Sequence, residues 1–356
     1  MPEPLLEVKD LRIHFFTDEG AVKAVDGVDL TIERGKTLCL VGESGCGKSV
    51  TSRAFLKIVR SPGRIVGGQM LYHQRLANGS TQVLDIAQMD AKGKEIRKIR
   101  GKEISMIFQE PMSSLSVMHT VGNQIIETIL LHEKVSKQEA RNRAIELLKL
   151  VEIPKPERLV DEYPFRLSGG MRQRAMIAMA LSCNPTLLIA DEPTTALDVT
   201  TQAQILKLMR KLQADYGMAV LFITHDLGVV AEIADDVAVM YLGRIVEQCD
   251  VDTLFNSPKH PYTQALLKSI PRISGQRREL DPIQGMVPSP FRRPSGCTFH
   301  TRCTQRFAPC SAVEPAMTEL SANHRVRCLL YESLPNLPEG NNGVNSAFAG
   351  REQPAK

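Results

Sequence analysis

Residues 168–174 read S-G-G-M-R-Q-R, and they lie between a glycine-rich loop at 42–49, G-E-S-G-C-G-K-S, and the acidic pair Asp191–Glu192. The loop follows an apolar stretch, T-L-C-L-V at 37–41, and precedes a segment at 50–59 that we expect to be helical. Strand, loop and helix in this order are the context that the phosphate-binding pattern G-x-x-x-x-G-K-[ST] requires. The sequence therefore predicts an α/β fold built around a nucleotide.

The glycine-rich loop is expected to surround the phosphates with backbone N–H groups, and the N-terminus of the following helix adds a favourable field. Lys48 would reach the β- and γ-phosphates, and the Ser49 hydroxyl would bind Mg²⁺. A chance glycine-rich turn would not explain the strand before it and the helix after it. The residues expected to contact the nucleotide here are Gly42, Glu43, Ser44, Gly45, Cys46, Gly47, Lys48, Ser49 and Val50.

The acidic pair ends the apolar run L-L-I-A at 187–190. Buried charge is costly unless it is compensated, so such a pair indicates a bound metal or water rather than a plain strand end. Asp191 fits coordination of Mg²⁺, partly through water, and Glu192 fits a general base that polarises the attacking water.

Two further polar side chains end apolar stretches, Gln109 after 104–108 and His225 after 219–224. Residues in such places are often only turn residues. Beside a phosphate loop, we expect Gln109 to sense Mg²⁺ and the γ-phosphate, and His225 to hydrogen-bond the γ-phosphate and hold the water. The predicted catalytic residues are Lys48, Gln109, Glu192 and His225, and the predicted Mg²⁺ ligands are Ser49, Gln109 and Asp191.

The rest of the chain divides by its hydrophobic pattern. Residues 5–40 alternate apolar and polar side chains between turns, which predicts short antiparallel strands, and strands alternate with helices over 186–245, which predicts a mainly parallel sheet. We therefore expect an α/β nucleotide-binding core formed by 1–110 and 184–250.

A helical subdomain is expected between the two parts of that core, at about 112–183. Residues 136–151 show its clearest pattern, because Ser136 and Glu139 form a capping box and the apolar residues then recur at three and four.

Composition limits the function. The chain has 356 residues, 43% of them hydrophobic, with a formal net charge of +4 and no Trp, so a polyanion partner and a stacking platform for nucleic acid are not expected. No apolar run approaches about 18 residues, and the N-terminus M-P-E-P-L-L-E-V-K-D lacks the pattern of a secretory signal. We expect a cytosolic protein that would reach a membrane through a partner.

Four of the eight cysteines gather near the C-terminus, with five, six and seventeen residues between them. They follow a Pro-, Gly- and Arg-rich segment at 271–296, and a tail without periodicity follows them from Pro335. Such a set is able to bind an iron–sulfur cluster or Zn²⁺, with His300 and His324 keeping a Cys/His zinc site open. Free thiols or disulfides are the alternative. The predicted ligands are Cys297, Cys303, Cys310 and Cys328.

Together these motifs resemble the ATP-binding subunits of ABC transporters over roughly residues 6–250. Walker A is 42–49, the Q-loop residue is Gln109, the signature is L-S-G-G-M-R-Q at 167–173, and Walker B is 187–191 followed by Glu192. The resemblance implies a RecA-like core, an antiparallel β subdomain and an inserted helical subdomain, assembled as a head-to-tail dimer with two ATP molecules at the interface. The residues that it adds to the nucleotide site are Ser168, Gly169, Gly170 and Gln173 of the signature, Asp198 of the D-loop, and Phe15 stacked on adenine with Phe16 as second choice.

The C-terminal part resembles the oligopeptide/dipeptide import family, through L-F-N-S-P-K-H-P-Y-T-Q-A-L-L-K-S-I-P at 254–271 and the cysteines after it. That likeness implies a [4Fe–4S] cluster, a second and distinct ABC ATPase subunit, two permease subunits and an extracytoplasmic solute-binding protein. It places the chain on the cytoplasmic face of the inner membrane. The implied domains are an ATPase at 1–255, an extension and linker at 256–296, a four-cysteine metal module at 297–331 and a disordered tail at 332–356.

Two segments depart from the family pattern: Y-P-F-R-L-S-G-G at 163–170 has Phe165–Arg166 where a His-Glu pair is usual, and S-L-S-V-M-H-T at 114–120 lacks the usual Asn-Pro. Both concern the expected permease surface rather than catalysis. A soluble ABC ATPase would need tandem nucleotide domains or a long coiled-coil insertion, and a metal-sensing regulator would not need Glu192 and His225. Oligosaccharide, opine or nickel cargo stays open, because the ATPase never touches its cargo.

Overall fold

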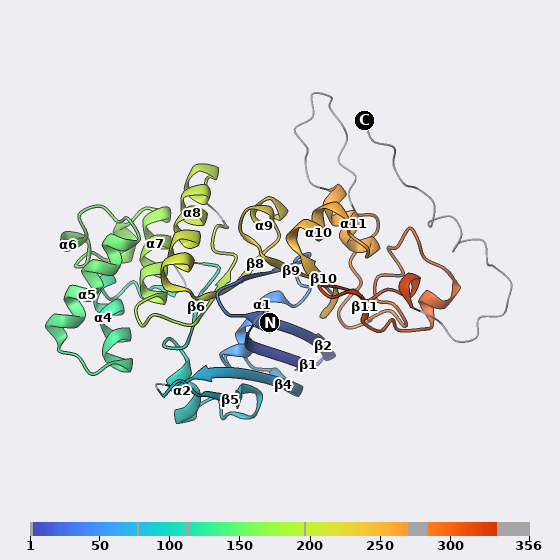
Figure 1. The fold of residues 1–356 in the computed structure, drawn as a ribbon, viewed down its shortest axis with the longest axis horizontal. Helices are drawn as coiled ribbons and strands as arrows, with labels where there is room; N and C mark the ends of the chain where they lie inside the picture. Colours follow the sequence, from blue (N-terminus) through green and yellow to red (C-terminus); the bar gives the residue numbers. More distant parts are fainter. Residues whose placement is uncertain (1–2, 77, 111–113, 196, 270–282, 333–356) are drawn as a thin grey trace, which may run out of the picture.

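The computed structural model describes residues 3–76, 78–110, 114–195, 197–269 and 283–332 (Figure 1). Part of the expected linker and almost all of the expected tail lie outside these ranges. A large sheet runs through the middle of the molecule, a smaller antiparallel sheet lies on one side of it, and a group of helices occupies one end.

The large sheet has the strand order β11-β12-β10-β9-β3-β8-β7-β6. Its centre is parallel, since β3 pairs in parallel with both β8 and β9, and β7 with β8 and β6. β3, β6, β7 and β8 are buried along their whole length, as expected for a parallel sheet covered on both faces. The bounds are β3 Thr37–Val41, β6 Ile104–Ile107, β7 Leu187–Asp191, β8 Ala219–Thr224, β9 Asp236–Tyr241, β10 Arg244–Asp250, β11 Thr318–Ser321 and β12 His324–Val326.

The smaller sheet has the order β2-β1-β4-β5 and is antiparallel throughout. The prediction of antiparallel strands before the phosphate loop is thus confirmed, and two further strands after the loop complete the sheet. The bounds are β1 Pro4–Thr17, β2 Gly20–Glu33, β4 Gly63–Arg75 and β5 Thr81–Asp85.

Several of the helices begin at a residue whose side chain caps them. Ser136 accepts a hydrogen bond from the Glu139 N–H at the start of α5, as the capping pattern predicts, and Ser168 and Asp198 cap α7 and α8 in the same way. The bounds are α1 Lys48–Phe55, α2 Lys94–Ile99, α4 Val121–His132, α5 Lys137–Leu150, α6 Pro156–Leu159, α7 Gly169–Ala180, α8 Val199–Tyr216, α9 Leu227–Ile233, α10 Val251–Asn256 and α11 Pro261–Lys268.

Two apolar clusters lie against the large sheet, one on each of its faces. Within β7, Leu188 and Ala190 belong to the cluster that faces the helices, and Leu187 and Ile189 to the one that faces the antiparallel sheet. Successive side chains of a strand point to opposite faces, so one apolar run serves both clusters. The ends of the central strands are thereby fixed between two packed layers.

The C-terminal extension, residues 283–332, adds strands to the edge of the large sheet. β12 pairs with β10, with Glu247 opposite Val326, and β11 lies outside β12. Across this pairing the buried Glu247 carboxylate meets His324 Nε2 at 2.8 Å and accepts the N–H groups of Lys259 and His260.

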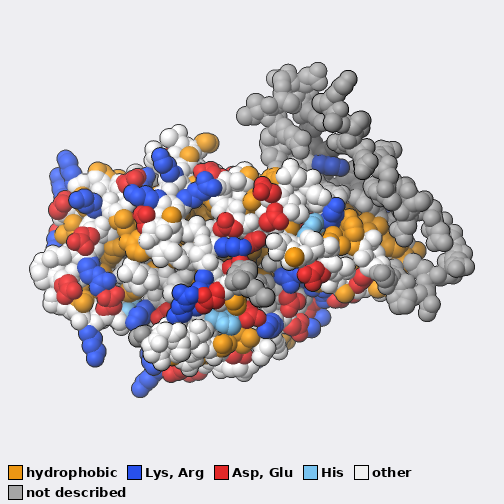
Figure 2. All heavy atoms as spheres, in the orientation of Figure 1, with side chains coloured by type: hydrophobic (Ala, Val, Ile, Leu, Met, Phe, Trp, Pro, Cys, Tyr) orange, Lys and Arg blue, Asp and Glu red, His pale blue; other side chains and the backbone are white. Residues whose placement is uncertain are grey.

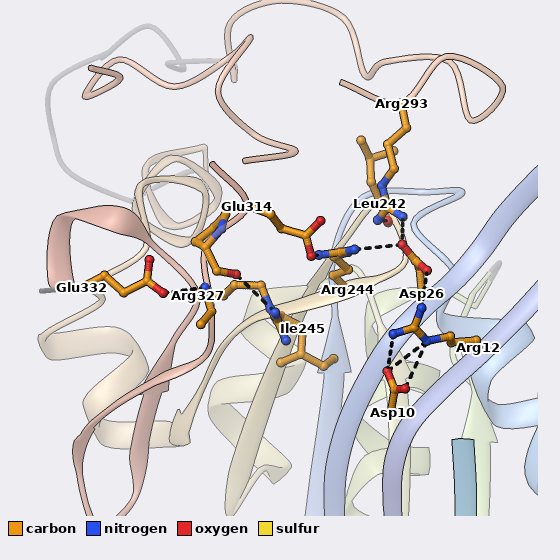
Figure 3. Close-up of polar contacts among 12 residues, drawn as sticks. Asp10, Arg12, Asp26, Leu242, Arg244, Ile245, Arg293, Glu314, Arg327 and Glu332 are labelled. Carbon is orange, nitrogen blue, oxygen red and sulfur yellow. Dashed lines mark hydrogen bonds and ion pairs between the residues drawn. The ribbon is translucent and has the colours of Figure 1, made fainter. Parts of the chain in front are cut away.

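Ion pairs fasten the extension further along its length (Figure 3). Arg293 of the extension reaches the buried carboxylate of Asp26 on β2 at 2.6 Å, beside Arg244 of β10 at 2.9 Å. Arg327 donates to the Ile245 carbonyl at 3.1 Å. The cysteine-bearing segment is therefore attached to both sheets of the molecule.

Candidate nucleotide site

The phosphate loop is held closed by its own lysine. Lys48 Nζ donates to the Gly42 carbonyl at 2.7 Å and to the Glu43 carbonyl at 3.1 Å. The backbone has no room for side chains at two of the glycines: a Cβ would lie 2.2 Å from the Met240 carbonyl oxygen at Gly42 and 2.4 Å from the Ala24 carbonyl oxygen at Gly47. These contacts explain why the loop needs glycine where the motif has it.

A magnesium site is indicated by the pair that Ser49 forms with Asp191. Ser49 Oγ donates to Asp191 Oδ1 at 2.8 Å, while the buried Oδ2 of the same carboxylate has no hydrogen-bond partner among the described residues. Burial raises the pKa of Asp191, although the Ser49 hydrogen bond opposes that effect. A divalent cation would supply the missing partner and would favour the ionised carboxylate, so the donor set fits Mg²⁺.

Glu192 is the meeting point of the predicted catalytic side chains. Gln109 Nε2 donates to Glu192 Oε2 at 2.9 Å, and His225 Nδ1 lies 3.3 Å from Oε1. The sequence led us to expect Gln109 and His225 at the metal and the γ-phosphate, whereas in the structure both contact this carboxylate.

The backbone of Glu192 is unusual as well. Its φ is 47°, in the left-handed region that non-glycine residues rarely adopt, and its N–H donates to the Ile223 carbonyl at 2.9 Å. Such a conformation turns the side chain from the end of β7 toward the loop that carries His225. Strain of this kind is often found at functional sites.

The S-G-G segment, residues 168–170, lies at the start of α7. Ser168 and Gly169 are exposed at the N-terminus of α7, and a Cβ on Gly169 would meet no described atom within 4 Å. Gln173, which we predicted to contact nucleotide, lies inside with 2% exposure, so it does not share the surface of the glycines. The exposed N–H groups at this helix start suit an anion brought by another molecule.

Comparison with known proteins agrees with this geometry. A family model described as "ABC transporter" matches residues 25–195, and one described as "Oligopeptide/dipeptide transporter, C-terminal region" matches residues 246–310. The oligopeptide transport ATP-binding protein AppD of Bacillus subtilis is 49% identical over 92% of this chain and 97% of its own length. OppD of the same organism, also an oligopeptide transport ATP-binding protein, is 49% identical over 94% and 91%.

The chain belongs to the oligopeptide/dipeptide-import ATP-binding subunits of the ABC transporter family. It is thus an ABC-type P-loop ATPase. Among solved structures, a dimeric post-hydrolysis state of the ATP-binding cassette MJ0796 bound to ADP and Pi shares 27% identity, with a TM-score of 0.59 over 69% of this chain and 98% of that one.

The two remaining predicted contacts of this ABC ATPase differ in their surroundings. Asp198 accepts hydrogen bonds from the backbone and the hydroxyl of Thr201, which lower its pKa and cap α8. Phe15 is half-buried beside Gly63, whereas Phe16 is 48% exposed with the Arg64 guanidinium 5.9 Å from its ring centre. Of the two, Phe16 offers the larger free ring face.

The four C-terminal cysteines come together from distant points of the extension. The Cys297 N–H donates to the Cys310 carbonyl at 2.9 Å. Burial raises the pKa of Cys297 to about 11 and that of Cys328 to about 12, and neighbouring thiols of the set, Cys303 among them, add to both shifts. All four are free thiols.

His324 does not lie with these cysteines. Among the described residues, one group of at least three His, Cys, Asp or Glu side chains has its ligand atoms within 4.8 Å of one another, and its members are Glu247, Cys249 and His324. The Nε2 atom of His324 is already engaged by Glu247, and His300 Nδ1 lies 2.8 Å from the Cys297 carbonyl. A mixed Cys/His zinc site at the four cysteines gains no support from either histidine.

Two residues that the motifs did not identify touch the phosphate loop. The Tyr262 hydroxyl accepts the Glu43 N–H at 2.9 Å, and Arg302 pairs with the Glu43 carboxylate. Both lie more than 200 positions beyond the loop, so no local spacing could have found them.

Proposed function

We propose that this ATPase powers the uptake of di- and oligopeptides through separate membrane permease subunits. The observation that carries the proposal is the convergence of Gln109 and His225 on Glu192, next to the phosphate loop and the Ser49–Asp191 pair. The peptide cargo rests on the relatives named above and on the C-terminal family match, because no cargo contacts this subunit.

In the proposed reaction Lys48, positioned by the Gly42 and Glu43 carbonyls, binds the β- and γ-phosphates of ATP. Ser49 and Asp191 would hold Mg²⁺, which neutralises phosphate charge. Glu192 accepts a hydrogen bond from the attacking water and so raises its nucleophilicity. Gln109 and His225 are positioned to exchange their contacts with Glu192 for contacts with the γ-phosphate when nucleotide is bound.

The active site is completed by a second ATPase subunit. Ser168 and Gly169 are exposed and Gly170 is half-buried, at the N-terminus of α7 in the helical end of the molecule (Figure 1). We expect them to bind the γ-phosphate held by the partner, with Asp198 at the same interface, and we expect the partner to be a related but distinct ATPase.

Exposed apolar side chains on the helical end of the molecule, where Figure 2 shows apolar groups among charged ones, fit a membrane-embedded partner. Met118 is 77% exposed and Phe165 57%, and the Phe165 ring stacks on Tyr163 with 5.6 Å between ring centres. These side chains come from the two segments that depart from the family pattern. Among the described helices, none is long and apolar enough to cross a membrane. We propose a peripheral position at the cytoplasmic face of the inner membrane because the relatives are ATP-binding subunits of peptide transporters.

We assign a [4Fe–4S] cluster to the four C-terminal cysteines. Four thiolates on one tetrahedral zinc would lie about 3.8 Å apart, given Zn–S bonds of about 2.3 Å. Among the described residues, no three of these sulfurs lie within 4.8 Å of one another, so the set is spaced more widely than a single zinc requires. A cluster distributes its thiolates over several metal atoms and so suits wider spacing. Iron and sulfide analysis of anaerobically purified protein tests this: zinc, or no metal, would refute it.

The deciding experiment for the ATPase is Glu192→Gln. The amide keeps the size of the side chain but cannot act as a base, so we expect ATP binding to persist while turnover falls by about 100-fold or more. Wild-type turnover in this variant would remove Glu192 from the mechanism. Peptide uptake is tested separately, in membranes containing the permease and the solute-binding protein, with nickel and oligosaccharides as competing cargo.

A further inference from the structure

Glu43, the second residue of the phosphate loop, is held through three of its groups at once. Its N–H donates to the Tyr262 hydroxyl at 2.9 Å, and its carbonyl accepts from Lys48 Nζ at 3.1 Å. Its carboxylate accepts two hydrogen bonds from one guanidinium, Arg302 Nη1 at 2.6 Å and Nη2 at 3.0 Å. Both Tyr262 and Arg302 belong to the part of the chain that follows the ATPase core.

The Arg302 side chain is held in place by several neighbouring groups. Its residue exposure is 8%, its Nε donates to the Gln284 carbonyl at 3.1 Å, and its guanidinium lies 5.9 Å from the ring centre of Tyr241. The hydrogen bonds to Glu43 raise the pKa of Arg302. A bidentate pair with a buried arginine fixes direction as well as distance, which a lysine would not do.

An aromatic cluster supports the same contact. Tyr241 ends β9, Tyr262 lies on α11, and Phe299 comes from the segment between Cys297 and Cys303. Their ring centres are 4.7 Å apart for Tyr241 and Tyr262, 5.2 Å for Tyr241 and Phe299, and 5.3 Å for Tyr262 and Phe299. All three are almost completely buried, so Tyr262 has little freedom to move away from Glu43.

We propose that Arg302 is a positioning residue for the phosphate loop. It orients Glu43, and Glu43 through its carbonyl holds Lys48 in the place from which the lysine meets the nucleotide. The C-terminal extension thereby preorganises the ATP site of the same chain, and ATP binds more weakly when the contact is lost. The inference rests on the proposed nucleotide site, which the experiment below tests independently.

The contact is separable from the attachment of the extension. Arg293 binds Asp26 and Arg327 binds the Ile245 carbonyl (Figure 3), and His324 binds Glu247, so none of these contacts involves Arg302 or Glu43. These interactions remain when Arg302 is replaced. Arg302→Gln therefore tests the loop, and Arg327→Gln is the matched control that weakens attachment without touching Glu43.

The experiment measures binding of the non-hydrolysable analogue AMP-PNP with Mg²⁺ to the full-length subunit by calorimetry, together with the thermal midpoint of the nucleotide-free protein. We expect Arg302→Gln to weaken binding about 5- to 10-fold and Arg302→Lys about 2- to 3-fold, because each loses part of the paired geometry. Arg327→Gln should lower the thermal midpoint while leaving the affinity within about 2-fold of the unchanged protein.

A double-mutant cycle decides whether Glu43 transmits the effect. In a Glu43→Gln background, Arg302→Gln should cause little further loss of affinity, since the pair is already broken. Unchanged affinity in Arg302→Gln, an equal loss in Arg327→Gln, or additive losses in the cycle would each overturn the proposal. Should Arg302→Gln fail to fold, Arg302→Lys and Glu43→Gln give the same comparison. If the unchanged subunit bound no AMP-PNP, the nucleotide site itself would be wrong, which is a distinguishable result.

Discussion

The phosphate loop and the C-terminal extension are both fixed firmly, but by different parts of the chain. The loop is fixed by backbone: Gly42 and Gly47 press against carbonyls of neighbouring strands, and Lys48 closes the loop with carbonyls of the loop itself. The extension joins the sheet through the backbone of β12, and along the rest of its length side-chain pairs such as His324 with Glu247 and Arg302 with Glu43 attach it. A backbone-fixed site has a short sequence motif, whereas a site fixed by distant side chains has none.

The comparison predicts that Lys48→Ala in the loop causes the largest loss, which is a loss of ATPase rate. Its ammonium group is the cation that the motif directs at the phosphates, and the described loop offers no second side chain in its place. We expect the ATPase rate to fall by at least about 100-fold with little change in folding. Phosphate release assays and circular dichroism on the same preparation measure both. A variant that hydrolysed ATP normally would show that the backbone alone holds the phosphates.

Next in size is the effect of His324→Ala on stability. The variant leaves Glu247, which has 0% exposure, with only the N–H groups of Lys259 and His260 as donors. Loss of one partner from a buried ion pair is strongly destabilising, and the surviving donors reduce the cost to about 2–3 kcal/mol of unfolding free energy. Urea unfolding measures it. The matched control is Arg325→Ala on the same strand, where about 0.5 kcal/mol or less is expected.

The contrast between the loop and the extension also explains which parts of the site could be predicted from the sequence. Glu192, Asp191, Gln109 and His225 could each be identified, because each ends an apolar strand and the ends of parallel strands meet at one edge of the sheet. The contacts of Gln109 and His225 with Glu192 could not, since they depend on the left-handed backbone at Glu192.

The extension shows the other limit. Its cysteines stand out by count, but the pairing of β12 with β10 involves three-residue and seven-residue strands whose partners are more than 70 positions apart.

Gln173 illustrates a third case: it belongs to the signature motif, yet the helical period of α7 turns it inward. Motif membership alone does not establish that a side chain reaches the ligand.

Acid should loosen the attachment of the extension to β2. Burial by itself would raise the pKa of Asp26, but hydrogen bonds and charges of Arg244 and Arg293 lower it overall. A lowered folded-state pKa contributes stability that is present above the ordinary Asp value and is lost as the pH falls through the folded one. We therefore expect protease cleavage of the extension to increase below about pH 4. In Asp26→Asn, cleavage should already be raised at neutral pH and should depend less on acid.

The smallest predicted effect is on the unfolding free energy, through loss of the Ser136 N-cap of α5 that the capping pattern predicted. Ser136→Ala removes the acceptor for the Glu139 N–H at the start of α5, whose Ala140, Ala144 and Leu148 are fully buried. Loss of an N-cap costs about 1 kcal/mol, and α5 lies far along the chain from Lys48 and Glu192, so the ATPase rate should be unchanged. Ser136→Asp restores an acceptor and should recover the unfolding free energy. Slower hydrolysis in Ser136→Ala would instead mean that the helical subdomain is coupled to the phosphate loop as tightly as the extension is. The contrast between the loop and the extension would then no longer explain which substitutions change ATP binding or hydrolysis.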